Sequence, residues 1–119
     1  MRKAQGNSRM DNIFTFPRHA QTADDEFFET LLHASGDVRI ERILSHGNVT
    51  PDGSWYDQEQ DEWVTVLEGS AKIAYPDGSE TALARGDCLF IPKHKRHRVA
   101  YTSSPCVWLA IFGNFLTSA

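Results

Sequence analysis

The sequence lacks several features that would point to particular classes of protein. It has only two cysteines, no apolar run near the roughly 20 residues that span a bilayer, and no apolar stretch after Met1 that resembles a secretion signal. We therefore expect a cytoplasmic, reduced protein without a membrane segment. Cys88 and Cys106 both lie in apolar stretches, which favours small buried hydrophobic residues over catalytic thiols.

An excess of basic residues is also absent. The 12 lysines and arginines are outnumbered by 16 aspartates and glutamates, which gives a formal net charge of −4. Because contacts to phosphates need a basic surface, this balance argues against nucleic-acid binding. The single basic cluster, Lys93 to Arg98, is interrupted by histidines and is interpreted as a solvent-exposed loop.

The length and composition fit one globular domain. The 119 residues are 40% hydrophobic and 24% charged, so the chain can bury a single core. The first residues are polar and show no periodicity, which is typical of a disordered leader. We expect a leader at residues 1–11 and a single domain at residues 12–119.

Short apolar stretches separated by turn-forming residues predict an all-β protein. The clearest turn is Pro76–Ser79, and residues 38–44 show alternation, with Val38, Ile40 and Leu44 between polar residues. There is no long amphipathic pattern, although residues 27–33 could form a helical turn instead of a strand. About nine strands are expected, which favours a barrel or jelly-roll sandwich: 12–17, 27–33, 38–44, 63–67, 71–75, 80–83, 88–91, 97–101 and 106–112. The first of these suits a sheet edge or an exchange with a second subunit.

Two segments carry the most specific pattern in the chain. In the first segment, six residues separate Glu62 from Gly69. In the second, five residues separate Gly86 from Pro92, and four separate Pro92 from His97. The order and spacing of these residues resemble the two motifs of the cupin superfamily. The resemblance implies a cupin double-stranded β-helix, which is a jelly-roll-like barrel.

The resemblance covers residues 45–112, and it departs from the family pattern at two places in the second motif. His94 stands where glycine is usual, and Tyr101 stands where asparagine is usual. Cupins include dioxygenases, isomerases, epimerases, decarboxylases, storage proteins and sensor domains. The resemblance therefore implies an architecture rather than a reaction.

The two histidines of the first cupin motif are missing. Counting back from Glu62 with the shorter spacing places Tyr56 and Gln58 at their positions, whereas the longer spacing places Trp55 and Asp57 there. The first register is preferred because Tyr56, Gln58 and Glu62 lie on one face of an extended chain.

The resemblance implies a candidate metal site. Cupins usually hold a divalent metal ion with three histidines and one glutamate, and the matching residues here are Glu62 and His97, with Gln58 and Tyr56 as substitutes. Such an oxygen-rich set favours zinc, iron(II) or manganese over copper or nickel. Hydrogen bonding within a pocket suits Gln58 and Tyr56 equally well.

Other residues are weaker candidates. His46 and His94 could complete a coordination sphere, but histidines in such loops are more often surface residues. The tryptophans at positions 55, 63 and 108 could line a pocket, and large aromatic residues in a small barrel are more often part of the core or a subunit interface.

Three classes of function follow. The first is a cupin that binds a divalent metal and a small-molecule ligand, with an anionic substrate and an unassigned metal-dependent reaction. The alternative is a metal-free module that binds or senses a small molecule without catalysis. The third is a purely structural or interaction protein, and the resemblance implies a homodimer in all three cases.

Overall fold

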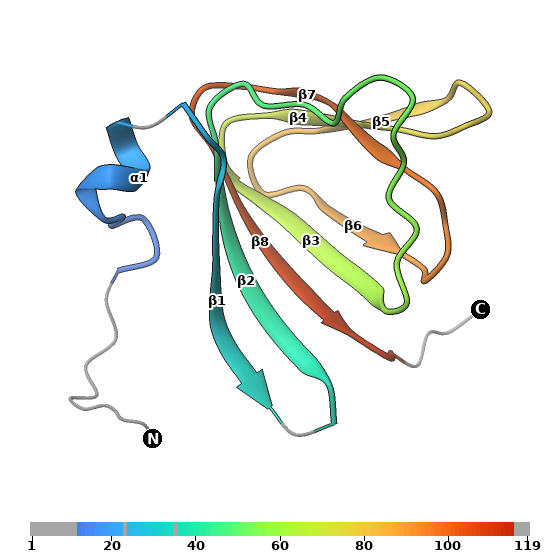
Figure 1. Ribbon diagram of the computed structural model, residues 1–119, viewed down its shortest axis with the longest axis horizontal. Helices are drawn as coiled ribbons and strands as arrows, with labels where there is room; N and C mark the ends of the chain where they lie inside the picture. The colour runs from blue at the N-terminus through green and yellow to red at the C-terminus, as the bar shows by residue number, and fades with distance from the viewer. Residues whose placement is uncertain (1–11, 23, 35, 116–119) are drawn as a thin grey trace.

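The computed structural model describes residues 12–22, 24–34 and 36–115, which form one short helix and eight strands. The predicted leader, residues 1–11, lies outside the described residues. The expected all-β, jelly-roll-like barrel is confirmed (Figure 1). The elements are α1 (Arg18–Thr22), β1 (Phe27–Ala34), β2 (Val38–Ser45), β3 (Asp61–Glu68), β4 (Ala71–Ala74), β5 (Glu80–Leu83), β6 (Cys88–Ile91), β7 (Arg98–Thr102) and β8 (Cys106–Gly113).

The strands form two antiparallel sheets. The larger sheet has the order β1-β2-β8-β3-β6, and the smaller has the order β5-β4-β7. β8 lies between β2 and β3, where Trp108 is opposite Ile43 on one side and Val66 on the other. β8 therefore joins β2 and β3, which are not paired with each other, and holds them in one sheet.

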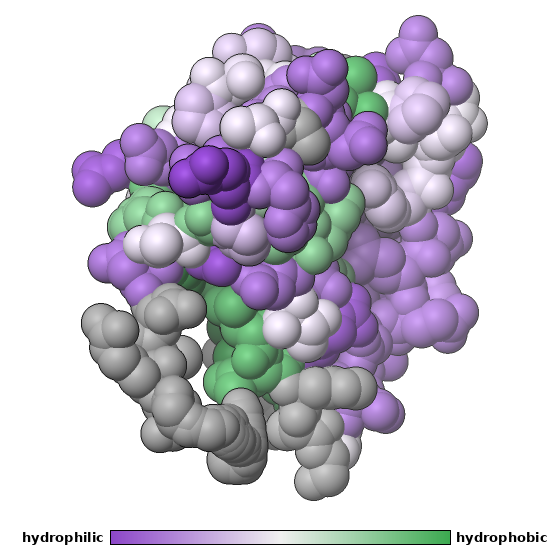
Figure 2. All heavy atoms as spheres, turned by 60° about the vertical axis from the view of Figure 1, so that its left-hand side comes forward, coloured by the Kyte–Doolittle hydropathy of each residue, from purple (hydrophilic) through white to green (hydrophobic). Residues whose placement is uncertain are grey.

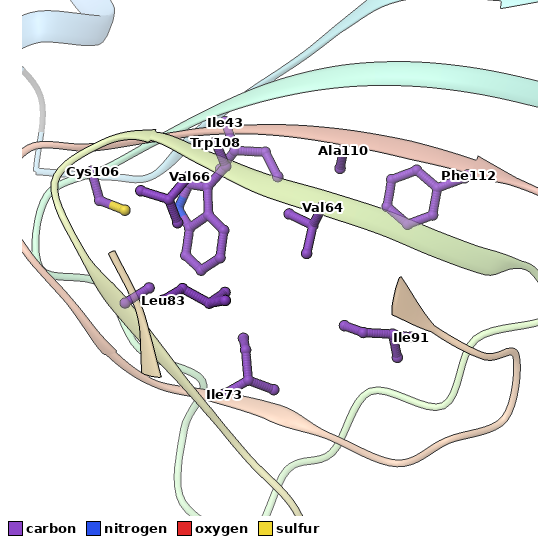
Figure 3. Close-up of a cluster of buried hydrophobic side chains, with 11 residues drawn as sticks. Ile43, Val64, Val66, Ile73, Leu83, Ile91, Cys106, Trp108, Ala110 and Phe112 are labelled. Atoms are coloured by element: carbon purple, nitrogen blue, oxygen red, sulfur yellow. The ribbon is translucent and has the colours of Figure 1, made fainter. Parts of the chain in front are cut away.

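The hydrophobic core lies between the two sheets. Successive side chains of a strand point to opposite faces, so one set of alternate residues from each strand meets its counterpart from the facing sheet. Figure 3 shows these side chains directed toward one another across the interior. The buried cluster consists of Ile43, Val64, Val66, Ala71, Ile73, Leu83, Ile91, Cys106, Trp108, Ala110 and Phe112.

The turn after β3 needs the glycine of the first motif. Gly69 has a φ of +86°, and a Cβ atom there would lie 2.3 Å from Ser103 Oγ and 2.6 Å from the carbonyl oxygen of Pro105. A side chain at this position would both strain the backbone and push apart the connections before β4 and β8.

A second, smaller cluster covers the outer face of the larger sheet. It contains Phe16 and Ala20 from the segment around α1, which pack with Leu44 of β2 and Val107 of β8. The short helix thus serves to close this side of the sheet beside β1 (Figure 1).

Arg42 of β2 attaches the segment before α1 to the sheet. The residue is 7% exposed, and its Nη1 donates to the carbonyl oxygens of Ile13 and Thr15, at 3.0 Å each. Its Nε donates to Glu29 Oε1 at 2.5 Å, and its guanidinium group lies 4.3 Å from the centre of the Phe16 ring. The predicted strand at residues 12–17 is therefore wrong, because these carbonyl groups bond to a side chain rather than to a neighbouring strand.

The two cysteines occupy different environments. Cys106 is fully buried in the core, and burial raises the pKa of its thiol to about 11. Cys88 is exposed at the start of β6, so the expectation that both cysteines are buried is wrong for this residue. Its side chain points away from the facing sheet, because the inward positions of β6 belong to Leu89 and Ile91.

The surface beside α1 and β1 is mixed in character. Figure 2 shows hydrophobic surface between hydrophilic residues on this face, and Phe28, Leu32 and Val38 are among the large hydrophobic residues that are exposed. Within residues 12–22, 24–34 and 36–115, no helix has the length and apolar character needed to cross a bilayer.

Arg42→Ala should lower the free energy of unfolding by about 2–4 kcal/mol, because it leaves the Glu29 carboxylate and two backbone carbonyl groups without their donor. Urea unfolding followed by circular dichroism would measure the change. Arg85→Ala is the matched control, since Arg85 is exposed in the turn before β6. Equal losses in the two variants would contradict the role of Arg42.

Candidate functional site

A cavity of about 480 Å³ lies between the two sheets. This volume falls within the range of about 300–1,000 Å³ that is typical of small-molecule pockets. Six of its apolar wall residues are labelled in Figure 3: Ile43, Val64, Ile73, Ile91, Trp108 and Phe112. Its other lining residues come from β1, β2, β3 and β7, from the residues just before β1 and β7, and from the connection between β2 and β3: Glu26, Phe28, Arg39, Glu41, Asn48, Val49, Thr50, Pro51, Tyr56, Gln58, Glu62, His97 and Val99.

The connection between β2 and β3 forms one wall of this cavity because it is hydrogen-bonded along β7. The N–H of Thr50 donates to the carbonyl oxygen of Val99 at 2.9 Å, and the N–H of Val99 donates to Thr50 Oγ1 at 2.9 Å. Further along, the N–H of Tyr56 donates to the carbonyl oxygen of His97 at 2.8 Å, and the N–H of His97 donates back at 3.2 Å. These bonds place the two sequence motifs side by side.

All four residues of the predicted metal site line this one cavity. Tyr56, Gln58 and Glu62 face it together, as expected from the shorter motif spacing, and His97 joins them from the opposite segment. The rings of Tyr56 and His97 are stacked, with centres 5.5 Å apart and planes inclined by 26°. The structure thus brings together the residues that the motif spacing selects.

His97 is buried, and its ring is fixed by the backbone. Its Nδ1 lies 2.8 Å from the carbonyl oxygen of Lys95, which can only accept, so Nδ1 carries the hydrogen. Burial lowers the pKa of the imidazole, with the hydrogen bond to Lys95 acting in the opposite direction. The neutral ring therefore leaves Nε2 with a lone pair that can accept a hydrogen bond or bind a metal ion.

Glu62 is a buried carboxyl group near the start of β3, an interior strand of the larger sheet. It is 9% exposed and is paired in register with Ile91 of β6 and Phe112 of β8. Burial raises the pKa of Glu62 to about 7, opposed by a hydrogen bond from Gln58. The carboxyl group therefore exists in both protonated and ionised forms near neutral pH.

Two further charged residues of the cavity were not selected by the sequence analysis. Arg39 Nε donates to Glu41 Oε2 at 2.9 Å, and the guanidinium carbon of Arg39 lies 4.3 Å from the centre of the Phe112 ring. Ile43 faces the same cavity, so alternate residues of β2 place charges and an apolar group on the inward face. The same alternation in the sequence would have predicted Arg39 and Glu41 as cavity residues if the face of β2 that carries these charges had been taken as the inner one.

Glu26 was also missed, because it precedes β1 and belongs to no motif. Its Oε2 accepts a hydrogen bond from the hydroxyl group of Ser45, and Ser45 Oγ accepts one from Trp108 Nε1 at 3.0 Å. Partial burial and the nearby carboxylates of Glu26 and Glu62 raise the pKa of Tyr56. Tyr56 is therefore a protonated phenol that can donate a hydrogen bond into the cavity.

The weaker histidine candidates do not line the cavity. His94 is exposed, and its Nδ1 lies 2.8 Å from Asp57 Oδ1, while His46 Nε2 lies 2.9 Å from the carbonyl oxygen of Ala20. His94 has a φ of +64°, so the backbone keeps the left-handed conformation that the usual glycine would adopt. Asp57 points outward, which agrees with the shorter motif spacing.

The tryptophans also have separate roles. Trp108 is in the core and lines the cavity, in agreement with the expectation that such residues are mainly core. The guanidinium groups of Arg96 and Arg98 lie 5.6 and 5.8 Å from the ring of Trp55. Trp63 alternates with Glu62 and Val64 and therefore lies on the outer face of the larger sheet.

A divalent metal ion would find few strong donors here. Among the residues that the structure describes, no group of three histidine, cysteine, aspartate or glutamate side chains is placed to hold an ion. Of the four predicted ligands, Glu62 and His97 are strong donors and Gln58 and Tyr56 are weaker ones. This set fits a loosely held ion rather than a tightly bound structural one.

Comparison with known families and structures agrees with this architecture. The family described as Cupin domain matches residues 45–112. A structure from Ralstonia eutropha JMP134, named as a putative mannose-6-phosphate isomerase, is 42% identical, covers 90% of this chain and 99% of its own, and has a TM-score of 0.80. No protein with a curated description matches the chain.

More distant structures share the fold. A cupin superfamily protein from Desulfitobacterium hafniense DCB-2 is 22% identical over 77% of this chain and 80% of its own, with a TM-score of 0.65. An RmlC-like cupin protein from Desulfovibrio desulfuricans is 18% identical over 90% of this chain and 98% of its own, with a TM-score of 0.66.

The raised pKa of Glu62 predicts that stability depends on pH. The folded state binds this proton more tightly than the unfolded state, so the stabilisation is complete below pH 4.5 and is lost as the pH rises through about 7. This difference in pKa corresponds to about 3 kcal/mol.

Glu62→Gln should therefore remove most of the fall in the free energy of unfolding between these pH values. Chemical unfolding at a series of pH values would measure it, with Glu68→Gln as the control because Glu68 is exposed. Parallel pH profiles for wild type and Glu62→Gln would contradict the assignment.

Proposed function

This chain belongs to the cupin domain family, and from that premise we propose that it binds a small molecule in the cavity of its barrel. The observation that carries the proposal is the convergence of Tyr56, Gln58, Glu62 and His97 on one cavity whose remaining wall is largely apolar. A few polar groups in an otherwise apolar cavity are typical of sites that orient a small ligand.

The polar residues have complementary hydrogen-bonding roles. His97 offers an acceptor at Nε2, Tyr56 offers a phenolic donor, and Glu62 offers a donor when it is protonated and an acceptor when it is not. Gln58 holds the Glu62 carboxyl group in place. A ligand with a hydroxyl, carbonyl or amine group could satisfy several of these groups at once.

The three tryptophans provide an internal test of cavity binding. We expect small aromatic fragments to shift the NMR signal of the Trp108 indole N–H, because Trp108 lines the cavity. The indole signals of Trp55 and Trp63 are the controls, since neither ring lines it. A fragment library that never moves the Trp108 signal would refute the proposal.

A metal-dependent function is the second candidate. It is favoured by the fixed ring of His97, whose Nδ1 bond resembles the support usually given to metal-binding histidines, and by the buried Glu62 carboxyl group. Glu62 and His97 would hold zinc, iron(II) or manganese, with Gln58 and Tyr56 as further ligands. When bound, the ion would supply a Lewis acid beside the ligand.

Metal analysis separates the two candidates. We expect less than one zinc, iron or manganese ion per chain in protein purified without chelator, because only two of the four predicted ligands, Glu62 and His97, are strong donors. A stoichiometric ion that is lost in His97→Ala and Glu62→Ala, and retained in His94→Ala, would establish the second candidate instead. His94 is a suitable control because it lies outside the cavity.

The name of the 42% identical relative suggests isomerisation of a sugar phosphate. Such a substrate needs basic groups to hold its phosphate. Arg39 is the arginine that lines the cavity, and it is already paired with Glu41. We therefore propose binding of a small molecule without assigning that reaction. The expected homodimer stays a prediction.

A further inference from the structure

The charges on the cavity wall are unbalanced. The acidic residues Glu26, Glu41 and Glu62 line the cavity, whereas among the residues that the structure describes Arg39 is the single arginine on its wall and no lysine lies there. Charges in a partly enclosed, largely apolar space are screened less than charges at the surface. The wall therefore favours a ligand that does not add another negative charge.

The positive charge of Arg39 is already partly neutralised. Its Nε donates to Glu41 Oε2 at 2.9 Å, and its guanidinium group lies on the ring of Phe112. An anionic ligand would have to share this guanidinium group with Glu41, and would bring a second negative charge close to that carboxylate.

Glu26, in contrast, presents a carboxylate without a basic partner. Within the described part of the chain, no lysine, arginine or histidine nitrogen lies within 4.0 Å of it. The hydroxyl group of Ser45 fixes one of its oxygens, and the indole N–H of Trp108 fixes that hydroxyl group in turn. The carboxylate is thus held in one orientation at the cavity wall.

Aromatic and apolar side chains surround the position where a cation would lie. Tyr56 and Trp108 line the same cavity as Glu26, and aromatic faces attract organic cations. Phe28 and Val49 also line the cavity, although they are 54% and 51% exposed. They therefore lie where the cavity meets solvent, and they offer contacts to the apolar part of a ligand.

We propose that the ligand of this cavity is a small amphipathic organic cation, an amine whose ammonium group pairs with Glu26 and whose apolar part lies against Trp108 and Val64. This inference rests on the proposed function, because it assigns a chemical class to the ligand of the same cavity. It sets the chain apart from proteins that bind sugar phosphates.

Three probes of the same shape and different charge test the inference: benzylamine, benzyl alcohol and benzoate. Each is titrated into the wild-type protein in the presence of a chelator, and the Trp108 indole signal reports binding. We expect benzylamine to bind at least about tenfold more tightly than benzoate, with benzyl alcohol between them. Mannose 6-phosphate should not shift the signal.

Glu26→Gln tests the partner of the ammonium group. The amide can still accept the hydrogen bond from Ser45, so the fold should persist, and the affinity for benzylamine should fall to that for benzyl alcohol. Glu80→Gln removes the same charge from an exposed position at the start of strand β5 and should leave all three affinities unchanged.

The failures are distinguishable. Tighter binding of benzoate or mannose 6-phosphate than of benzylamine would overturn the inference and leave the proposed function standing. If no probe shifts the Trp108 signal at millimolar concentration, both are overturned. The comparison of the three probes needs only the wild-type protein, so the result does not depend on how the variants fold.

Discussion

The hydrogen bonds between the connection after β2 and strand β7 are the interaction on which the site depends. Without them, Tyr56 and His97 would belong to two unrelated loops. The paired backbone bonds between these two residues bring one motif onto the other, and the bonds between Thr50 and Val99 extend the contact. The irregular connection thereby acts as an additional wall of the barrel, and the cavity exists because that wall stands apart from β1 and β2.

The site also shows how polar groups can be buried in a small barrel. Glu62 and His97 would be costly to bury as charged groups, and both respond by favouring their neutral forms. The remaining charges of the interior are kept near other polar groups: Arg39 with Glu41, and Glu26 with Ser45. The core cluster and the cavity lie in the same interior, and several core side chains also form the cavity wall.

Much of the fold could be predicted because local chemistry fixes it. Turns such as Pro76–Ser79 mark the ends of strands, and β5 and β6 begin and end where the sequence indicates. The segment at residues 12–17 could not be predicted correctly, since its structure depends on Arg42, far away in the sequence. Apolar composition alone does not distinguish a strand from a chain segment that packs on the outside of a sheet.

The site was predictable only as far as the motifs reach. Motif spacing selected Tyr56, Gln58, Glu62 and His97, and the structure places them in one cavity. Motif spacing does not reach Arg39 and Glu41. The alternation in β2 indicates the apolar residues of that strand, and it does not by itself show which face is the inner one. Leu44 of that pattern packs on the outer cluster with Phe16, while the charged residues face inward. In a barrel with a polar cavity, the more polar face of a strand can be the inner one.

The position of β1 has a consequence for the rate of ligand exchange. β1 is one of the two edge strands of the larger sheet, its one strand neighbour within the described part of the chain is β2, and its register shifts between Thr30 and Leu32. Phe28 belongs to this strand and lies at the solvent boundary of the cavity. An edge strand can detach locally at a lower free energy than the whole barrel can unfold. The residence time of a ligand would then depend on how often β1 opens locally. A mutation in β1 would change this residence time with little change in the equilibrium affinity.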